Sequence, residues 1–201
     1  FKDLKDPNAY NPERSKQLLA EDGWKDTDGD GILDKDGKPL TFDFVVYNSR
    51  AELPLYAEAV QADLKKVGID MKIKTVDYNL IDKMGQDGDY DMLISNIVTA
   101  NTGDPIWFLA NYWHTNVDGS NPQNGSGYSN PQVDQLLDAA ETEFDPAKRR
   151  DYAIQIQQLL MNDGAALFLG YPKTNIVTGS YLKGAVMYPS DYYWITNKIT
   201  K

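Results

Sequence analysis

An acidic stretch near the start of the chain has residue types and a spacing that could bind a metal ion. Residues 26–31 read Asp-Thr-Asp-Gly-Asp-Gly, the beginning of a calcium-binding loop with oxygen ligands at alternate positions and glycine at the turn. The last position of such a loop holds a bidentate glutamate, and here it is Gly37, so one side of the cage is open. This ligand count favours the alternative, an acidic hairpin turned by its glycines. The candidate ligands for a weak calcium site are Asp26, Asp28, Asp30 and Asp34.

The only histidine, His114, is the second candidate metal ligand. It ends the segment 106–114, in which four aromatic residues are followed by a polar stretch. That pattern is typical of either a core helix or the lip of a ligand pocket. A lone histidine binds a metal only with partner ligands from elsewhere in the molecule. The alternative is a hydrogen-bonded structural histidine, and the residues alone leave both roles open.

Sequence signatures of enzymes are missing. The chain contains no H-E-x-x-H, G-x-S-x-G or G-x-G-x-x-G pattern, and a Ser-His-Asp arrangement would depend wholly on His114. Residues 31–38 resemble a phosphate-binding loop, but five residues separate the glycines where four are required, and Pro39 stands where Ser or Thr would bind magnesium. We therefore expect a protein that is not an enzyme.

Composition restricts the class of protein further. The chain has 201 residues, a formal net charge of −10 and 41% hydrophobic residues, which fits one globular domain or a pair of small ones. Nucleic acid is a poor partner for so acidic a chain, and no apolar run is long enough for a membrane-spanning helix. The absence of cysteine is compatible with an exported bacterial protein. Because the chain opens at Phe1 without methionine, signal peptide or lipidation cysteine, we expect it to be processed or cut from something longer.

The elements that must position these residues are marked by caps and by hydrophobic periodicity. Three Asx-Pro pairs, which satisfy and pre-set a first helical turn, predict helices over about 12–21, 131–142 and 146–162. A further helix, at about 52–67, carries one apolar stripe and stops at Gly68.

Alternation of apolar and polar residues over 69–74 predicts a half-exposed strand. Segments 41–48, 90–97 and 167–173 are further strand candidates, because they are rich in aliphatic and aromatic residues. The order strand, helix, strand, helix, strand indicates an α/β fold with a mixed β-sheet flanked by helices. Residues from about 115 to 129 read as a long surface loop.

Taken in order, several segments resemble the signature of family 5 extracytoplasmic solute-binding proteins, the binding subunits of peptide and nickel ABC importers. The resemblance covers nearly the whole chain, and its specificity comes from the order of the segments. They are residues 10–24, 26–31, 36–40, 57–69, 103–105, 127–134 and 145–150.

The resemblance implies one lobe of a two-lobed, periplasmic-binding-protein-like (type II) receptor that closes on its ligand and delivers it to a permease. The matched segments belong to the C-terminal portion of longer relatives. We expect residues 1–187 to form the lobe and residues 188–201 to cross toward the other one. Such a receptor is extracytoplasmic, either periplasmic or lipid-anchored at the outer face of the cytoplasmic membrane. We expect a monomer that requires no cofactor, with calcium or nickel as candidates, and weak or absent ligand binding by this lobe alone.

The resemblance also implies ligand contacts. Peptide-binding relatives have an aspartate for the ligand ammonium in the approach to the turn at 103–105, where this chain has Asn101. Arg50 is placed to meet a ligand carboxylate, or is an exposed flanking charge. In nickel-binding relatives a histidine downstream of the same turn contacts the nickel chelate, which makes nickel the alternative ligand. Trp107, Trp113 and Tyr128 are candidates for the pocket wall, or for the core. The expected ligand-binding set is Arg50, Asn101, Thr102, Asp104, Trp107, Trp113, His114 and Tyr128.

Overall fold

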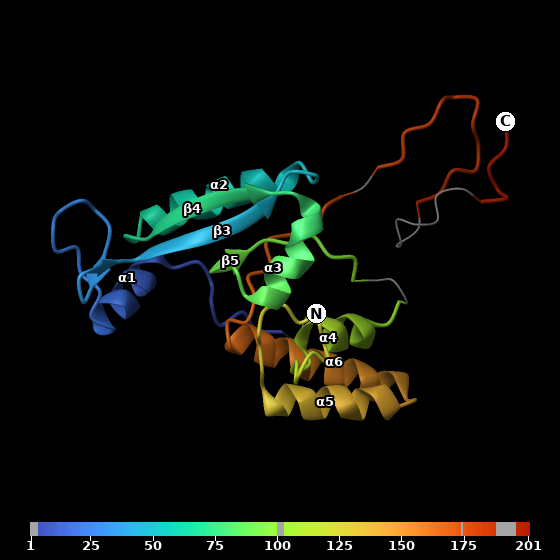
Figure 1. Cartoon of the computed structure of the whole chain (residues 1–201). Helices are drawn as coiled ribbons and strands as arrows, with labels where there is room; N and C mark the ends of the chain where they lie inside the picture. The colour runs from blue at the N-terminus through green and yellow to red at the C-terminus, as the bar shows by residue number, and fades with distance from the viewer. Residues whose placement is uncertain (1–3, 100–102, 174, 188–195) are drawn as a thin grey trace.

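Strand β3 (Thr41–Tyr47) is the centre of a three-stranded parallel sheet. In the computed structural model, which describes residues 4–99, 103–173, 175–187 and 196–201, β3 lies between β4 (Asp70–Val76) and β5 (Met92–Leu93). The last four residues of β3 are buried, as expected for a parallel strand covered on both faces. Helix α2 (Glu52–Lys65) forms the crossover from β3 to β4 and packs along both strands (Figure 1).

The sheet and its helices share one apolar core. We call these elements and their core the sheet unit. The 3₁₀ turn η1 (Tyr78–Leu80) and helix α3 (Ile81–Asp87) follow β4 and lead to β5. The buried residues of this core are Phe44, Val45, Val46, Tyr47, Leu53, Ala57, Met71, Ile81 and Ile94.

A small hairpin and the first helix cover the opposite end of the sheet. Strands β1 (Asp34–Lys35) and β2 (Lys38–Pro39) pair antiparallel around Asp36 and Gly37, which both have positive φ, as in the two-residue turns that match strand twist. Helix α1 (Pro12–Glu21) packs here through Leu19, next to a small core of Leu40, Val67 and Ile69.

Three helices form the second part of the molecule, the helical unit: α4 (Pro105–Trp113), α5 (Pro131–Thr142) and α6 (Pro146–Asn162), with the loop 115–129. They lie side by side, separate from the sheet (Figure 1). Their shared core consists of Ile106, Leu109, Trp113, Val133, Leu137, Ala140, Ala153, Ile156 and Leu160.

The two units touch where α3 meets the loop 115–129. The Tyr90 hydroxyl donates a hydrogen bond to the Gly125 carbonyl. Gly85 and Gly125 bring their backbones so close that a Cβ on Gly125 would lie 3.0 Å from the Gly85 Cα. A side chain on Gly125 would therefore press against the Gly85 backbone and force it to shift.

Most of the predicted elements are confirmed. The α/β fold class is correct, and the three proline-capped helices begin and end at the predicted residues. The predicted helix 52–67 ends two residues early, at Lys65, and the strand predicted at 41–48 ends at Tyr47. The strand predicted at 69–74 is β4, and residues 115–129 hold no helix or strand, as predicted for a loop.

Three expectations about the sheet are wrong. The sheet is parallel rather than mixed, and within the described residues antiparallel strand pairing occurs in the β1–β2 hairpin. The strand predicted at 90–97 shrinks to Met92–Leu93. The Ile94 backbone N–H still donates to the Val45 carbonyl, whereas the Asn96 backbone N–H donates to the Tyr47 hydroxyl (3.0 Å) rather than to a strand. Residues 167–173 form neither helix nor strand, and their backbone pairs with no strand in the described part of the chain.

The segment predicted to cross toward another lobe, 188–201, lies largely outside the described residues. Of its described part, Thr200 makes an isolated antiparallel bridge with Lys183. The lobe boundary at residue 187 stays a prediction. Among the described residues, no helix combines the length and the apolar character needed to cross a membrane.

Candidate functional site

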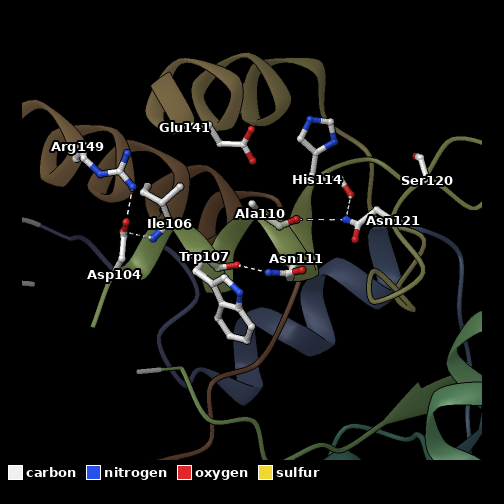
Figure 2. Close-up of a pocket in the computed structure, with 10 residues that line it drawn as sticks. All are labelled: Asp104, Ile106, Trp107, Ala110, Asn111, His114, Ser120, Asn121, Glu141 and Arg149. Carbon is white, nitrogen blue, oxygen red and sulfur yellow. Dashed lines mark hydrogen bonds and ion pairs between the residues drawn. The ribbon is translucent and has the colours of Figure 1, made fainter. Parts of the chain in front are cut away.

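A groove of about 510 Å³ runs along α4 and is bordered by α5, by the first turn of α6 and by the loop 115–129 (Figure 2). It brings together three of the residues that the sequence predicts for ligand binding: Asp104, Trp107 and His114. The full lining is Asp104, Ile106, Trp107, Ala110, Asn111, His114, Ser120, Asn121, Glu141 and Arg149.

Helix α4 is positioned by its cap and by one apolar face. The Asp104 side chain accepts a hydrogen bond from the Ile106 backbone N–H (2.9 Å), and Pro105 occupies the first turn. Ile106, Leu109 and Trp113 are buried in the core of the helical unit. Their burial turns the residues at the complementary spacing toward the groove, namely Trp107, Asn111 and His114.

Arg149 closes one end of the groove. Its guanidinium forms an ion pair with the Asp104 carboxylate and donates hydrogen bonds to the carbonyls of Ala140 and Glu143 (3.0 Å for Glu143). Sequence reasoning missed this residue. Its position in the first turn of α6 was the available sequence signal. The helix dipole disfavours a cation there, which suggests a specific acidic partner.

His114 follows α4 as its C-cap and faces oxygen atoms on both sides of its ring. Nε2 lies 3.2 Å from the Asp138 Oδ1, while Nδ1 lies 3.3 Å from the Thr115 carbonyl and 3.7 Å from the Asp134 Oδ1. Partial burial lowers the pKa of His114, but the hydrogen bonds to Thr115 and Asp138 and the two carboxylate charges outweigh it, so the pKa is raised. A metal at either nitrogen would replace the hydrogen bond that this nitrogen makes, and the nearby oxygen could become a further ligand.

Asparagine side chains fix the loop 115–129 to the end of α4. Asn121 Nδ2 donates to the carbonyls of His114 (2.7 Å) and Ala110 (3.2 Å). Asn124, which is 4% exposed, donates to the carbonyls of His114 (2.9 Å) and Tyr128 (2.8 Å). Sequence reasoning took these asparagines only as loop markers. A buried asparagine that joins distant carbonyls has no local sequence signal.

Trp113 and Tyr128 lie in the core of the helical unit and do not line the groove. Their rings meet edge to face with centroids 5.7 Å apart. The Tyr128 hydroxyl donates to Asp163 Oδ2 (2.6 Å). Burial, together with this bond to a carboxylate, raises the pKa of Tyr128 to about 12. Core packing accounts for both aromatic residues here, and their predicted contact with a ligand stays a prediction.

The remaining predicted ligand contacts lie elsewhere. Arg50 is exposed and lies three residues after the end of β3, at the C-terminal edge of the parallel strands. Close to this edge, Tyr47 and Tyr78 pack edge to face, and Asn96 Nδ2 donates to the Glu52 carboxylate (3.0 Å). Asn101 and Thr102 lie outside the described residues.

The acidic stretch forms a turn stabilised by its own carboxylates. Asp26 accepts hydrogen bonds from the backbone N–H groups of Gly29 (2.7 Å) and Gly31 (3.0 Å). Asp26, Asp28 and Asp34 each offer an oxygen within 4.8 Å of the others, and Asp30 is not part of that group. These bonds agree with the acidic-hairpin interpretation, and calcium binding stays a prediction.

Comparison with known proteins decides the family. Residues 1–120 match the family model described as bacterial extracellular solute-binding proteins, family 5 Middle. The chain belongs to this family. The resemblance predicted from the sequence is thus confirmed. The family members are solute-binding proteins, which agrees with the absence of enzyme signatures.

Relatives within family 5 include both peptide- and nickel-binding proteins. The oligopeptide-binding protein AppA of Bacillus subtilis is 31% identical over 196 residues, which cover 94% of this chain and 34% of AppA. The structure of AppA in complex with a nonapeptide matches 94% of this chain and 37% of its own with a TM-score of 0.78. The nickel-binding protein NikA of Staphylococcus aureus is 26% identical over 98% of this chain and 38% of NikA.

The structure of that NikA in complex with Ni(L-His)₂ gives a TM-score of 0.66 at 27% identity, over 81% of this chain and 32% of its own. The predicted periplasmic-binding-protein-like (type II) fold is confirmed by these structures. The chain spans about a third of the length of the family 5 relatives that it matches. The match to the family model ends at residue 120, so α5, α6 and Arg149 lie beyond it.

Proposed function

We propose that this chain is a ligand-binding lobe of a solute-binding subunit that captures peptides outside the cytoplasmic membrane and delivers them to an ABC permease. One observation carries the proposal: the chain matches AppA over 94% of its length in both sequence and structure, and that structure holds a nonapeptide. The groove along α4 and the C-terminal edge of the strands would then form one wall of the binding site.

The position of this wall agrees with the general behaviour of α/β folds, in which ligands bind outside the carboxyl ends of parallel strands. Arg50 lies in the turn after β3, and its forked guanidinium suits a peptide carboxylate. Asp104 and Trp107 lie in the first turn of α4, the first helix after β5. Trp107 is half-buried in the groove lining, so it offers an apolar surface to a ligand.

The alternative function is binding of nickel or a nickel chelate, which the similarity to NikA supports. It assigns the metal contact to His114. Both ring nitrogens of His114 make hydrogen bonds in the free chain, so metal binding would have to replace at least one of them. The higher identity and TM-score of AppA make peptide the better-supported ligand.

The remaining proposals follow from the family. The protein is extracytoplasmic, either periplasmic or lipid-anchored, and it acts as a monomer without a required cofactor. Residues 1–187 form the lobe, and residues 188–201 lead toward a second one. Since binding sites of this kind bury most of a ligand between two walls, the lobe alone binds weakly.

The test is a two-dimensional NMR titration of the 201-residue chain with a nonapeptide and, separately, with nickel–histidine complex. The expected result is a peptide response in α4 and in the residues after β3, with a dissociation constant of roughly 1 mM or weaker. A response to nickel–histidine alone, centred on His114 and abolished by His114→Ala, would establish the alternative. Lys16→Gln, a change in α1, is the control variant and should leave both titrations unchanged.

A further inference from the structure

We propose that Arg149 is a positioning residue for ligand binding, because its guanidinium fixes the start of α4 against the end of α5. The inference rests on the proposed function and assigns Arg149, which lines one end of the groove, an indirect role in ligand binding. Figure 2 shows Arg149 beside Asp104 at one end of the groove, with Trp107 one helical turn further along α4.

One guanidinium joins two helices. It forms the ion pair with Asp104, the N-cap of α4, and it donates to the carbonyls of Ala140 and Glu143 at the end of α5. The side chains of Arg149 and Asp104 are 24% and 38% exposed, so this ion pair is partly shielded from solvent. Carbonyls at a helix end lack partners within the helix, and Arg149 supplies a donor to two of them.

The two oxygens of Asp104 have different tasks. Oδ1 accepts from the Ile106 backbone N–H and so starts the helix, while Oδ2 meets Arg149. The ion pair therefore acts on the capping group itself and sets the direction in which the first turn of α4 leaves its cap. Trp107 is in that turn, so its place in the groove depends on the pair.

The rest of α4 does not depend on Arg149. Beyond the first turn, Leu109 and Trp113 are buried in the core of the helical unit and hold the helix to α5 and α6 by apolar packing. Removal of the guanidinium should therefore leave the fold intact and displace the first turn. Lysine cannot replace it, because a single ammonium lacks the planar fork that reaches a carboxylate and two carbonyls together.

The experiment compares Arg149→Gln and Arg149→Lys in the 201-residue chain, with Arg150→Gln as the matched control. Arg150 is the exposed neighbour on α6, and no ion pair of its side chain is found among the described residues. Readouts are the thermal midpoint, the indole N–H resonance of Trp107 (assigned with Trp107→Phe) and the nonapeptide affinity from NMR, measured well below the midpoint of every variant.

Both Arg149 variants should shift the Trp107 resonance in the free protein. They should also lower the affinity for the nonapeptide by roughly tenfold, as for one lost charge-assisted contact. Arg150→Gln should do neither. Variants with a lower midpoint but unchanged Trp107 resonance and affinity would overturn the positioning role, and so would full rescue by lysine. If the wild-type chain does not respond to peptide at all, the proposed function fails. The Trp107 resonance in the free protein still reports separately on whether Arg149 sets the first turn.

Discussion

The sheet unit and the helical unit hold their elements together by different means. In the sheet unit, the backbone ladder between β3 and β4 and an apolar core fix the spacing of the strands. In the helical unit, polar side chains join the elements: Arg149 links α4 to α5, Asn124 links the loop to α4, and Tyr128 links the loop to the end of α6. Three packed helices have no shared backbone hydrogen bonds, so their orientation depends on apolar packing and on these side-chain bonds.

This difference separates stability from site geometry. A backbone ladder tolerates most side-chain changes that keep the core apolar, whereas each polar link of the helical unit depends on one side chain. The groove lies among those links. Substitutions there should alter the groove with modest cost in stability, and substitutions in either core should alter stability first.

The largest effects are expected when one side chain is truncated in each core. Leu137→Ala in α5 and Met71→Ala in β4 remove side chains that are 0% and 1% exposed, and each should lower the free energy of unfolding by about 2–5 kcal/mol. Urea unfolding measures both. Because the units touch at Gly85 and Gly125, we expect one cooperative transition.

Leu55→Ala is the control for this pair, since Leu55 is 66% exposed on α2 and its truncation should change stability by less than about 0.5 kcal/mol. Two separate transitions, each sensitive to only one core variant, would contradict the single cooperative unit. In that case the sheet unit and the helical unit would unfold independently of each other.

An intermediate effect is expected from the most buried polar link. Asn124→Ala leaves the carbonyls of His114 and Tyr128 without their side-chain donor, so it should cost about 2–3 kcal/mol, between a core truncation and a surface change. Asn124 is the only fully buried polar side chain among the described residues. Thermal unfolding measures the loss in the free energy of unfolding. The control is Gln123→Ala, because Gln123 is exposed in the same loop. An equal loss in both variants would mean that the loop is held by its backbone alone.

The sequence predicts the elements of this fold better than their partners. The Asx-Pro pairs at Asn130 and Asp145 predict the starts of α5 and α6 correctly, because capping depends only on neighbouring residues. Strand pairing depends on distant residues. The apolar run at 90–97 and the one at 167–173 carry the same local pattern, yet only Met92–Leu93 finds a place beside β3.

The site follows the same rule. The sequence points to the start of α4 through the turn before Pro105, and Asp104, Trp107 and His114 do line one groove. It gives no sign that Trp113 faces the core, because both faces of α4 are rich in aromatic residues. The role of Arg149 is missed because its partner Asp104 is far away in the chain. Only the packing of α6 against α4 brings the two side chains together.

The smallest effect concerns Tyr128, and it tests whether a polar link of the helical unit depends on charge state. Tyr128→Phe removes the hydrogen bond to Asp163 and should cost about 1 kcal/mol near neutral pH. The raised pKa of Tyr128 means that folding favours the protonated phenol. Its contribution is therefore complete below the ordinary value of 10.0 and is lost as the pH rises toward about 12.

At the acidic end, hydrogen bonds from Tyr128 and Asn130 lower the pKa of Asp163 below its ordinary 3.8, so that part of the link is present above pH 3.8 and is lost as the pH falls through the lowered value. Urea unfolding of wild type and Tyr128→Phe from pH 3 to pH 11 should show a constant difference in the middle of the range and a smaller one at both ends. Tyr171→Phe, at a tyrosine 82% exposed, should show no difference at any pH. A Tyr128→Phe difference that stays constant at alkaline pH would mean that ring packing, rather than the hydroxyl, joins the loop to α6.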